Sequence, residues 1–145
     1  PTLYSGDEVG QVNDYTYKED PDKAPDSRYI HRGKFDWDLV ENIKDEKSVQ
    51  GRIFDGLKLL EKIRRAEAVF NTDAEVYTKD YNDTSILWIV RKAEGEELHA
   101  VFNFSDEGKT IWMPEKGKYT DLVTGKREEI ETVELSGWDF VWMKR

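Results

Sequence analysis

The sequence predicts a mainly β fold with some α structure, in which the C-terminal half forms an antiparallel β-sandwich. The first observation is a change of period: apolar residues recur at helical spacing before Asn71 and alternate along short segments after it. The second is the frequency of turn formers between those segments, among them Glu94-Gly95 and Thr124-Gly125. Short alternating segments at regular spacing are typical of sandwiches, so we place the sandwich from about Thr72 to the end.

Seven segments carry the alternation that predicts strands. They are residues 74–78, 85–92, 98–104, 109–113, 118–123, 127–134 and 138–144. In the second segment Ile86, Trp88 and Val90 share one face, which is apolar enough to help build a core. We therefore expect seven strands, several of them joined by tight antiparallel hairpins.

Residues 48–65 form the strongest helical pattern. Five apolar residues lie at steps of three and four on one side of the helix: Val49, Ile53, Leu57, Leu60 and Ile63. Gly51 and Gly56 each disfavour a helix interior by about 1 kcal/mol relative to Ala. Glycine has no Cβ atom and so lets a neighbouring backbone come close, which leads us to expect that this helix packs against a sheet.

The region before this helix predicts little regular structure. Residues 1–4 have the character of a short buried strand. Residues 7–33 are polar and rich in turn formers, and a loop of this length in a compact domain is usually functional. Residues 35–43 predict a short helix capped by Asp36, with three apolar residues on one side: Trp37, Val40 and Ile43.

Composition excludes several classes of partner. The net charge of -9 leaves no basic stripe for phosphate groups, so we expect neither nucleic acid nor an anionic membrane as a partner. The 145 residues include no cysteine, which fits a reducing cytoplasm and excludes thiolate chemistry. The longest apolar run is too short to span a bilayer. The chain opens with Pro1 rather than Met, which suggests that its natural N-terminus lies elsewhere.

Few residues are arranged for catalysis or metal binding. Asp7 and Glu8 are adjacent, so they point to opposite sides of an extended segment, and we interpret them as loop carboxylates that hold backbone amides. His31 and His99 are the only histidines, and their spacing is not that of a metal site. There is no Gly-rich phosphate loop either, so we expect no metal and no cofactor. Arg28, in a polar loop, carries a planar guanidinium that suits a carboxylate or sugar hydroxyls.

The tryptophans suggest an alternative function. Five are present: Trp37, Trp88, Trp112, Trp138 and Trp142. Alternating aromatic residues in strands usually belong to the core, but Trp112 lies in a short predicted strand that ends at Pro114 and is the best candidate for an exposed ring. The alternative hypothesis is therefore a free-standing carbohydrate-binding module in which Trp112 or Trp88 stacks on sugar.

Several stretches of the chain resemble a known family. The segment that ends the eighth barrel strand in the α-amylase superfamily, glycoside hydrolase family 13, is similar to residues 1–10, PTLYSGDEVG. Together with QVND at residues 11–14, DSRYIHR at residues 26–32 and Gly51-Arg52-Ile53, it resembles the amylosucrase branch, whose members cleave sucrose and build or transfer α-glucan. The similarity continues to about Phe70, and more loosely through Asn103-Phe104-Ser105 to the C-terminus.

The resemblance implies a division into domains. Residues 1–70 would be the remnant of a catalytic (β/α)8 barrel, comprising its last strand, a long loop and its last helix, and residues 71–145 would be the C-terminal β-sandwich behind that barrel. Barrel enzymes place their chemistry at the C-terminal ends of the strands, so the loop after Tyr4 would line the sugar site. By position, Arg28 matches the family arginine that pairs with an aspartate of another barrel loop at the floor of the glucosyl subsite. Arg28 is therefore the candidate substrate-binding residue.

The resemblance also implies that this chain is inactive by itself. Family members use an Asp nucleophile and a Glu acid/base from earlier strands, and retaining chemistry requires both carboxyl groups. We therefore expect no catalytic residue here, in what would be a C-terminal fragment of a sucrose-active or α-glucan-active transferase or hydrolase. Without a barrel to cover it, the apolar face of residues 48–65 would either mediate dimerisation or leave residues 11–33 disordered.

Overall fold

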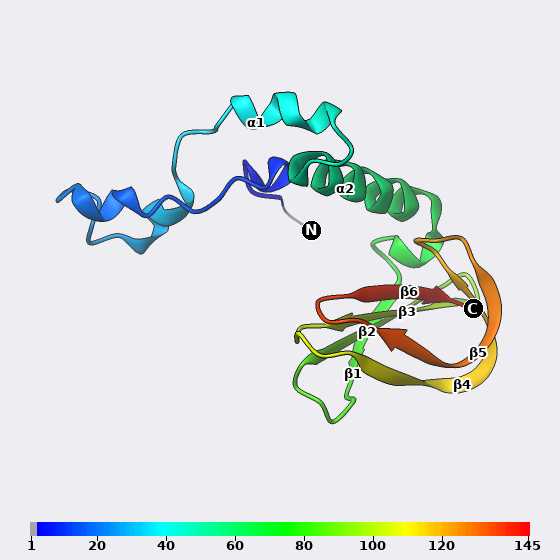
Figure 1. Cartoon of the computed structure of the whole chain (residues 1–145). Coiled ribbons are helices and arrows are strands. Elements are labelled where there is room, and N and C mark those ends of the chain that lie inside the picture. Colours follow the sequence, from blue (N-terminus) through cyan, green and yellow to red (C-terminus); the bar gives the residue numbers. More distant parts are fainter. Residues whose placement is uncertain (1–2) are drawn as a thin grey trace. The chain divides into compact units, whose positions relative to one another are not determined.

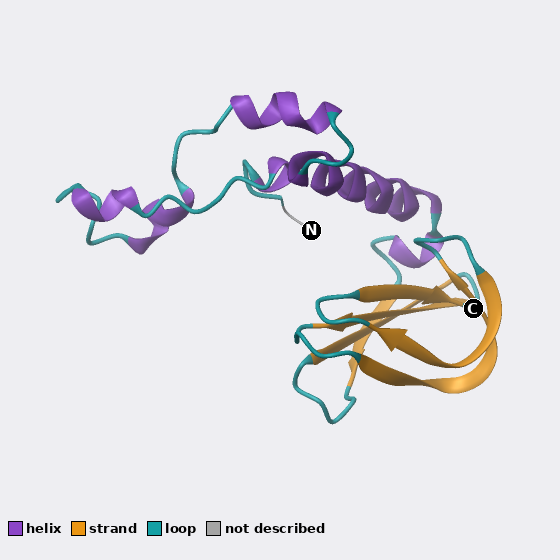
Figure 2. Ribbon diagram, viewed as in Figure 1, coloured by secondary structure: helices purple, strands orange, loops and turns teal. Residues whose placement is uncertain are grey.

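The computed structural model describes residues 3–145 of the chain, which divides into two compact units, Pro1–Leu59 and Leu60–Arg145. The helical and loop segments make up most of the first unit, and the six strands all belong to the second (Figure 2). Part of the strand predicted at residues 1–4 lies outside the described residues; Leu3 and Tyr4, which are described, are not in a strand. The functional division at residues 70 and 71 stays a prediction.

The first unit is built from short helical turns. The long polar loop is interrupted by 3-10 turns at Asp7–Val9, Thr16–Glu19 and Ser27–His31. The short helix predicted at residues 35–43 is found as α1 (Asp38–Glu41), extended by a 3-10 turn over Asn42–Lys44. Asp36 holds its start, because Asp36 Oδ1 accepts a hydrogen bond of 3.0 Å from the Asp38 amide.

The main helix, α2 (Val49–Ala66), lies almost where its periodicity placed it. Ser48 caps it, since Ser48 Oγ accepts a hydrogen bond of 2.8 Å from the Gly51 amide. A Cβ atom at Gly51 would lie 2.2 Å from the carbonyl oxygen of Asp45, so only glycine fits there. At Gly56, no described atom lies within 4 Å of such a Cβ. The close approach at Gly51 is therefore real, but it is made by the preceding loop and not by the expected sheet.

The two helix glycines give a matched test. Gly51→Ala would force the Asp45 backbone aside and should lower the stability of α2 by at least about 1 kcal/mol. Gly56→Ala meets open space and should raise helix stability by about 1 kcal/mol. Thermal unfolding followed by far-ultraviolet circular dichroism measures both changes, and equal effects of the two substitutions would contradict the described contact.

The second unit is one antiparallel sheet of six strands in the order β1-β2-β3-β6-β4-β5. The strands are β1 (Glu75–Lys79), β2 (Ile86–Ala93), β3 (Glu96–Asn103), β4 (Lys109–Asp121), β5 (Arg127–Leu135) and β6 (Phe140–Lys144). Strands β4 and β5 run together as a long curved ribbon (Figure 1).

The structure has one strand fewer than the seven predicted, because residues 109–113 and residues 118–121 of the segment 118–123 both belong to β4. Between them the pairing with β5 shifts, from Trp112 opposite Thr132 to Gly117 opposite Ile130. Pro114 has no amide hydrogen to contribute to a ladder, so this stretch bulges out of register. The turn formers at 115–117 thus mark an irregularity within a strand and not a hairpin.

The sheet curls so that one of its faces closes on itself. Its main core joins side chains of β2 and β3 to side chains of β4 and β5, which are not their neighbours in the strand order, and to Met143 of β6. The core residues are Trp88, Val90, Val101, Ile111, Met113, Tyr119, Val133, Leu135 and Met143. Strands that are not neighbours in a sheet can share a core only if the sheet folds over, as the two layers of a sandwich do. The predicted antiparallel β-sandwich is confirmed.

Two polar residues, Tyr81 and Asn103, stabilise the folded-over sheet through hydrogen bonds to backbone groups. The Tyr81 hydroxyl donates to the Thr110 carbonyl at 3.0 Å and accepts from the Trp112 amide at 3.1 Å, so it pairs backbone groups on an edge of β4. Asn103 is 2% exposed, and its side-chain amide donates to the carbonyl oxygens of Glu107 at 2.7 Å and Ser136 at 2.9 Å. Asn103 therefore ties the β3–β4 turn to the β5–β6 turn.

The opposite face of the sheet carries a second core, formed by Val69, Leu98, Ala100 and Trp142. Leu60 and Ile63, from the last turns of α2, pack against it together with Phe70. These two helix residues therefore find a partner within the chain, contrary to the expectation that the whole apolar face lacks one. Val49, at the other end of the helix, is 53% exposed. Within residues 3–145, no helix combines the length and the hydropathy that crossing a membrane requires.

Candidate functional site

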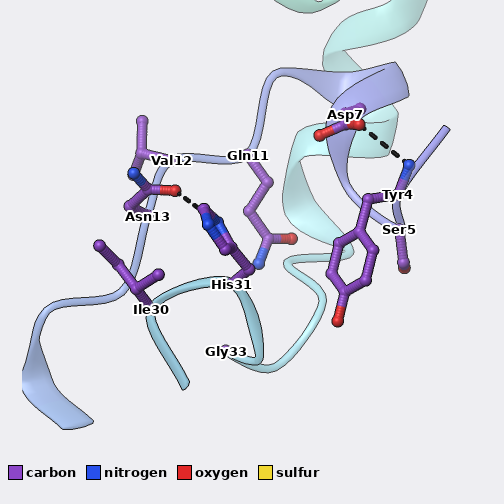
Figure 3. Close-up of a pocket in the computed structure, with 9 residues that line it drawn as sticks. All are labelled: Tyr4, Ser5, Asp7, Gln11, Val12, Asn13, Ile30, His31 and Gly33. Atoms are coloured by element: carbon purple, nitrogen blue, oxygen red, sulfur yellow. Dashed lines mark hydrogen bonds between the residues drawn. The ribbon is translucent and has the colours of Figure 1, made fainter. Parts of the chain in front are cut away.

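The two motif-bearing stretches of the first unit meet at a small hollow (Figure 3). The Asp14 amide donates to the Ile30 carbonyl at 2.9 Å, which brings the loop after Gly10 beside the turn at Ser27–His31. The lining is Tyr4, Ser5, Asp7, Gln11, Val12, Asn13, Ile30, His31 and Gly33. The sequence segments singled out by their resemblance are thus neighbours in space.

The polar side chains around this hollow are held by hydrogen bonds. His31 Nδ1 lies 3.1 Å from Asn13 Oδ1, and the ring of Tyr4 meets His31 edge-on with ring centres 6.5 Å apart. Gln11 spans the loop, since its amide nitrogen donates to the Lys34 carbonyl and its oxygen accepts from the Asp36 amide. The hollow has a volume of about 40 Å³, far below the roughly 300 Å³ of a typical ligand pocket. It is too small to enclose a ligand by itself.

Asp7 and Glu8 have the structural role that the sequence suggested. Asp7 Oδ2 accepts a hydrogen bond of 2.9 Å from the Tyr4 amide, and Glu8 Oε2 accepts one of 3.0 Å from the Gly6 amide. Both carboxylates therefore fix the turn after Tyr4. Every carboxyl pKa shift resolved among the described residues is downward, for example at Asp14, where the Thr16 hydroxyl donates to the carboxylate. A general acid needs the opposite shift, which none of these groups has.

Arg28 lies outside the hollow and pairs with a neighbour in its own turn. Its Nε donates to Asp26 Oδ1 at 2.8 Å and its Nη2 to Asp26 Oδ2 at 2.7 Å, a two-point contact between guanidinium and carboxylate. This pairing lowers the pKa of Asp26 to about 2 and raises the pKa of Arg28. The side chain of Arg28 is 73% exposed, so its remaining donors are open to a further acceptor.

The two histidines lie in different units. His99 is 1% exposed within the main core of the sandwich. Its Nδ1 accepts a hydrogen bond of 3.2 Å from the Trp88 indole, and its Nε2 lies 3.1 Å from Glu97 Oε1. Because Nδ1 accepts, the neutral ring carries its hydrogen on Nε2. Burial lowers the pKa of His99 to about 4; the nearby Glu97 acts against this, and the positive charges of Arg145, Lys79 and Lys92 act with it.

The buried histidine makes the stability of the sandwich depend on pH. Below about pH 6.5 the unfolded chain binds a proton at His99, whereas the folded chain does so only near pH 4. Stability should therefore be complete above pH 6.5 and fall by about 2 kcal/mol on acidification to about pH 5. The lowered pKa values of Asp26 and Asp83, about 2 each, act only at more acid pH.

Urea unfolding of the chain at a series of pH values measures this dependence. His99→Gln keeps a hydrogen-bonding side chain without a titrating proton, so its profile should be flat between about pH 5 and pH 6.5. A nuclear magnetic resonance titration of the His99 ring in the unchanged protein gives a second readout. A ring that became charged near its ordinary pKa of about 6.5 would contradict the assignment.

The structure distinguishes buried from exposed tryptophans, which the sequence alone could not do. Trp88 is 1% exposed and belongs to the main core, so its assignment as a sugar-stacking platform is wrong. Trp112 is 60% exposed, as predicted for a ring on the outer side of β4. Trp37 and Trp138, at 74% and 70%, are also exposed, and no sequence signal set them apart.

Comparison with known proteins matches residues 88–141 to the family described as the beta-galactosidase C-terminal domain. Trehalulose synthase MutB from Pseudomonas mesoacidophila MX-45 has a similar structure, with 20% identity over 82% of this chain and 24% of that protein and a TM-score of 0.61. The maltogenic amylase from S. marinus is 18% identical over 99% of this chain and 17% of its own, also with a TM-score of 0.61. AmyP, solved in complex with maltose, is 14% identical over 66% of this chain and 20% of its own, with a TM-score of 0.58.

These similarities establish the fold of the chain. The chain spans about a fifth of the length of the MutB structures, for example 19% of one of them. Its sandwich and the helical segment before it have the fold of the C-terminal part of amylase-family enzymes, which confirms the predicted fold class.

Proposed function

We propose that the chain is the C-terminal part of a retaining enzyme of the α-amylase superfamily, glycoside hydrolase family 13, which acts on sucrose or α-glucan. Residues 1–70 contribute the last strand, loop and helix of the catalytic barrel, and residues 71–145 form a sandwich that supports it. The chain has no catalytic activity by itself, because a retaining mechanism requires two facing carboxyl groups and the family supplies them from earlier barrel strands.

The observation that carries this proposal is the extent of the structural likeness. With the maltogenic amylase it covers 99% of this chain, including the irregular first unit, and only 17% of the enzyme. A free-standing module would be expected to match through its sandwich alone. Long loops and short turns are poorly conserved in shape unless something outside them requires that shape. The likeness over the loop segment therefore supports a role as part of a larger catalytic domain.

The finer assignment is to the amylosucrase-like branch. It rests on residues 1–14 and 26–32, which meet at the hollow beside Tyr4 and His31. MutB, a trehalulose synthase, has been solved with the substrate sucrose, which supports a sucrose-active parent. In that parent the free donors of Arg28 would contribute to the glucosyl subsite. A cytoplasmic location and dimerisation through the face of residues 48–65 remain predictions from the sequence.

The outer face of the sandwich supports the buttressing role. Beyond the part covered by Leu60 and Ile63, this face exposes Leu87 at 37% and Phe104 at 57%. The ring of Phe102 stacks on Phe104 with ring centres 6.3 Å apart and on Phe140 at 5.8 Å. A run of apolar rings on a sheet face is typical of surfaces that another protein layer covers.

The catalytic part of this proposal has a direct assay. The purified chain should release no glucose or fructose from sucrose and no glucose from malto-oligosaccharides above the uncatalysed background, because it lacks both reacting carboxylates. An active amylosucrase in the same assay is the positive control. Turnover that survives purification and is lost on Asp7→Asn or Glu8→Gln would refute the proposal.

Inactivity alone does not identify a fragment, so the reading frame upstream of Pro1 is the decisive observation. It should encode the earlier strands of a barrel together with an Asp nucleophile and a Glu acid/base. A start codon directly before Pro1 would leave the sandwich to be explained as a module complete in itself.

A further inference from the structure

Trp112 is an exposed indole fixed on a rigid pair of strands. On the inner side of the sheet its neighbours Ile111 and Met113 are 0% and 7% exposed, so the core holds the strand on both sides of it. Along one edge it pairs with Thr132 of β5, and on the other edge its amide donates to the Tyr81 hydroxyl at 3.1 Å. The backbone of Trp112 is thus held on both edges, and the indole projects from a defined position.

A carboxylate is held beside this indole on the same face. Residues 110 and 112 of β4 point outward with their partners 134 and 132 of β5, because alternate residues share a face. Thr110 Oγ1 donates to Glu134 Oε2 at 2.9 Å, which fixes the carboxylate and leaves its second oxygen able to accept hydrogen bonds. Glu134 is diagonal to Trp112, and such side chains lie about 7 Å apart.

This combination has a chemical preference. The flat apolar face of an indole suits the axial C–H groups of a pyranose ring, while a fixed carboxylate accepts hydrogen bonds from the hydroxyls at the edge of that ring. Anions are disfavoured, since Glu134 carries a negative charge in a chain of net charge -9. A protein partner is better matched by the run of phenylalanines on the outer side of β3 and β6, because the Trp112 ring is bordered by two threonines and a carboxylate.

We propose that Thr110, Trp112, Thr132 and Glu134 form a carbohydrate-binding surface on the sandwich. Trp112 stacks on one pyranose ring of a neutral oligosaccharide, and Glu134 accepts hydrogen bonds from its hydroxyls. The inference deepens the proposed function, on which the choice of an α-glucan as ligand rests. The surface holds a long glucan on the enzyme without taking part in bond cleavage.

The probe is maltoheptaose, added to the whole chain carrying isotope-labelled tryptophan. Each of the five indole N–H groups gives one magnetic resonance signal, and the spectrum of Trp112→Phe assigns that of Trp112. The Trp112 signal should move saturably up to about 10 mM maltoheptaose, the range in which a millimolar complex fills. Titration calorimetry, which does not need the Trp112 signal, should show maltoheptaose binding weakened about tenfold or more by Trp112→Ala and about three- to tenfold by Glu134→Ala.

Trp138→Ala is the matched control, because Trp138 is 70% exposed in the same unit but lies in the β5–β6 turn. Its affinity for maltoheptaose should stay within about twofold of the unchanged chain. Circular dichroism of each variant verifies that the sandwich is folded. The proposal is overturned if no indole signal moves, if Trp112→Ala binds as the unchanged chain does, or if only Trp138→Ala abolishes binding.

These outcomes are independent of the tests of the parent's activity. The upstream reading frame and the sucrose assay decide whether the chain belongs to a catalytic barrel, whatever Trp112 does. If a barrel is encoded upstream but maltoheptaose does not bind, only the proposal of a surface site at Trp112 is refuted. If maltoheptaose binds at Trp112 but no barrel is encoded upstream, the surface site stands and the proposed parent enzyme is refuted.

Discussion

The folding of one antiparallel sheet onto its own apolar face is the constraint on which the second unit depends. Strands β2 and β3 meet β4 and β5 only because the sheet curls, and the shared core contains Trp88 and Tyr119, each 1% exposed. A flat sheet of the same strands would leave both large rings in water, at a cost of roughly 2 kcal/mol or more for each. The bulge in β4 lets that strand bend as the closure requires.

Closure places polar groups where water cannot reach them, and the chain provides partners for most of these groups. Asn103 satisfies the carbonyl oxygens of Glu107 and Ser136, and the Tyr81 hydroxyl satisfies the carbonyl oxygen of Thr110. His99 differs from these groups because it can become charged, and its ring is buried between Trp88 and Glu97. Its neutral form fits the core, and the charged form does not. The same packing that stabilises the sandwich near neutral pH therefore opposes protonation of His99.

Sequence periodicity predicted the elements well because it reports local burial. Residues 48–65 predicted the helix almost to the residue, and the seven segments after Asn71 fall on the six observed strands, two of them on β4. Periodicity failed at residues 114–117, where turn formers sit in a bulge, since a bulge and a hairpin use the same residue types. It also could not separate buried Trp88 from exposed Trp112, because both alternate correctly and only the curl of the sheet decides which face is inside.

The candidate sites were harder to predict, since each depends on contacts between distant residues. Asp7 and Glu8 were interpreted correctly from local geometry, because their partners lie within three residues. The hollow beside His31 needs the pairing of Asp14 with Ile30, which no local pattern reveals. The partner of Arg28 was sought in a distant loop, whereas Asp26, two positions away, pairs with it in this chain.

The last turns of α2 belong physically to the sandwich, and this limits how the sandwich can be exchanged between proteins. Leu60 and Ile63 cover Leu98 and Trp142. A sandwich transferred to another protein from β1 onward would therefore expose this apolar surface to water. Recombination that transfers the module intact must cut upstream of Leu60, inside a helix. The protein that receives the sandwich must therefore supply the first part of the helix. This requirement favours inheritance of α2 and the sandwich together.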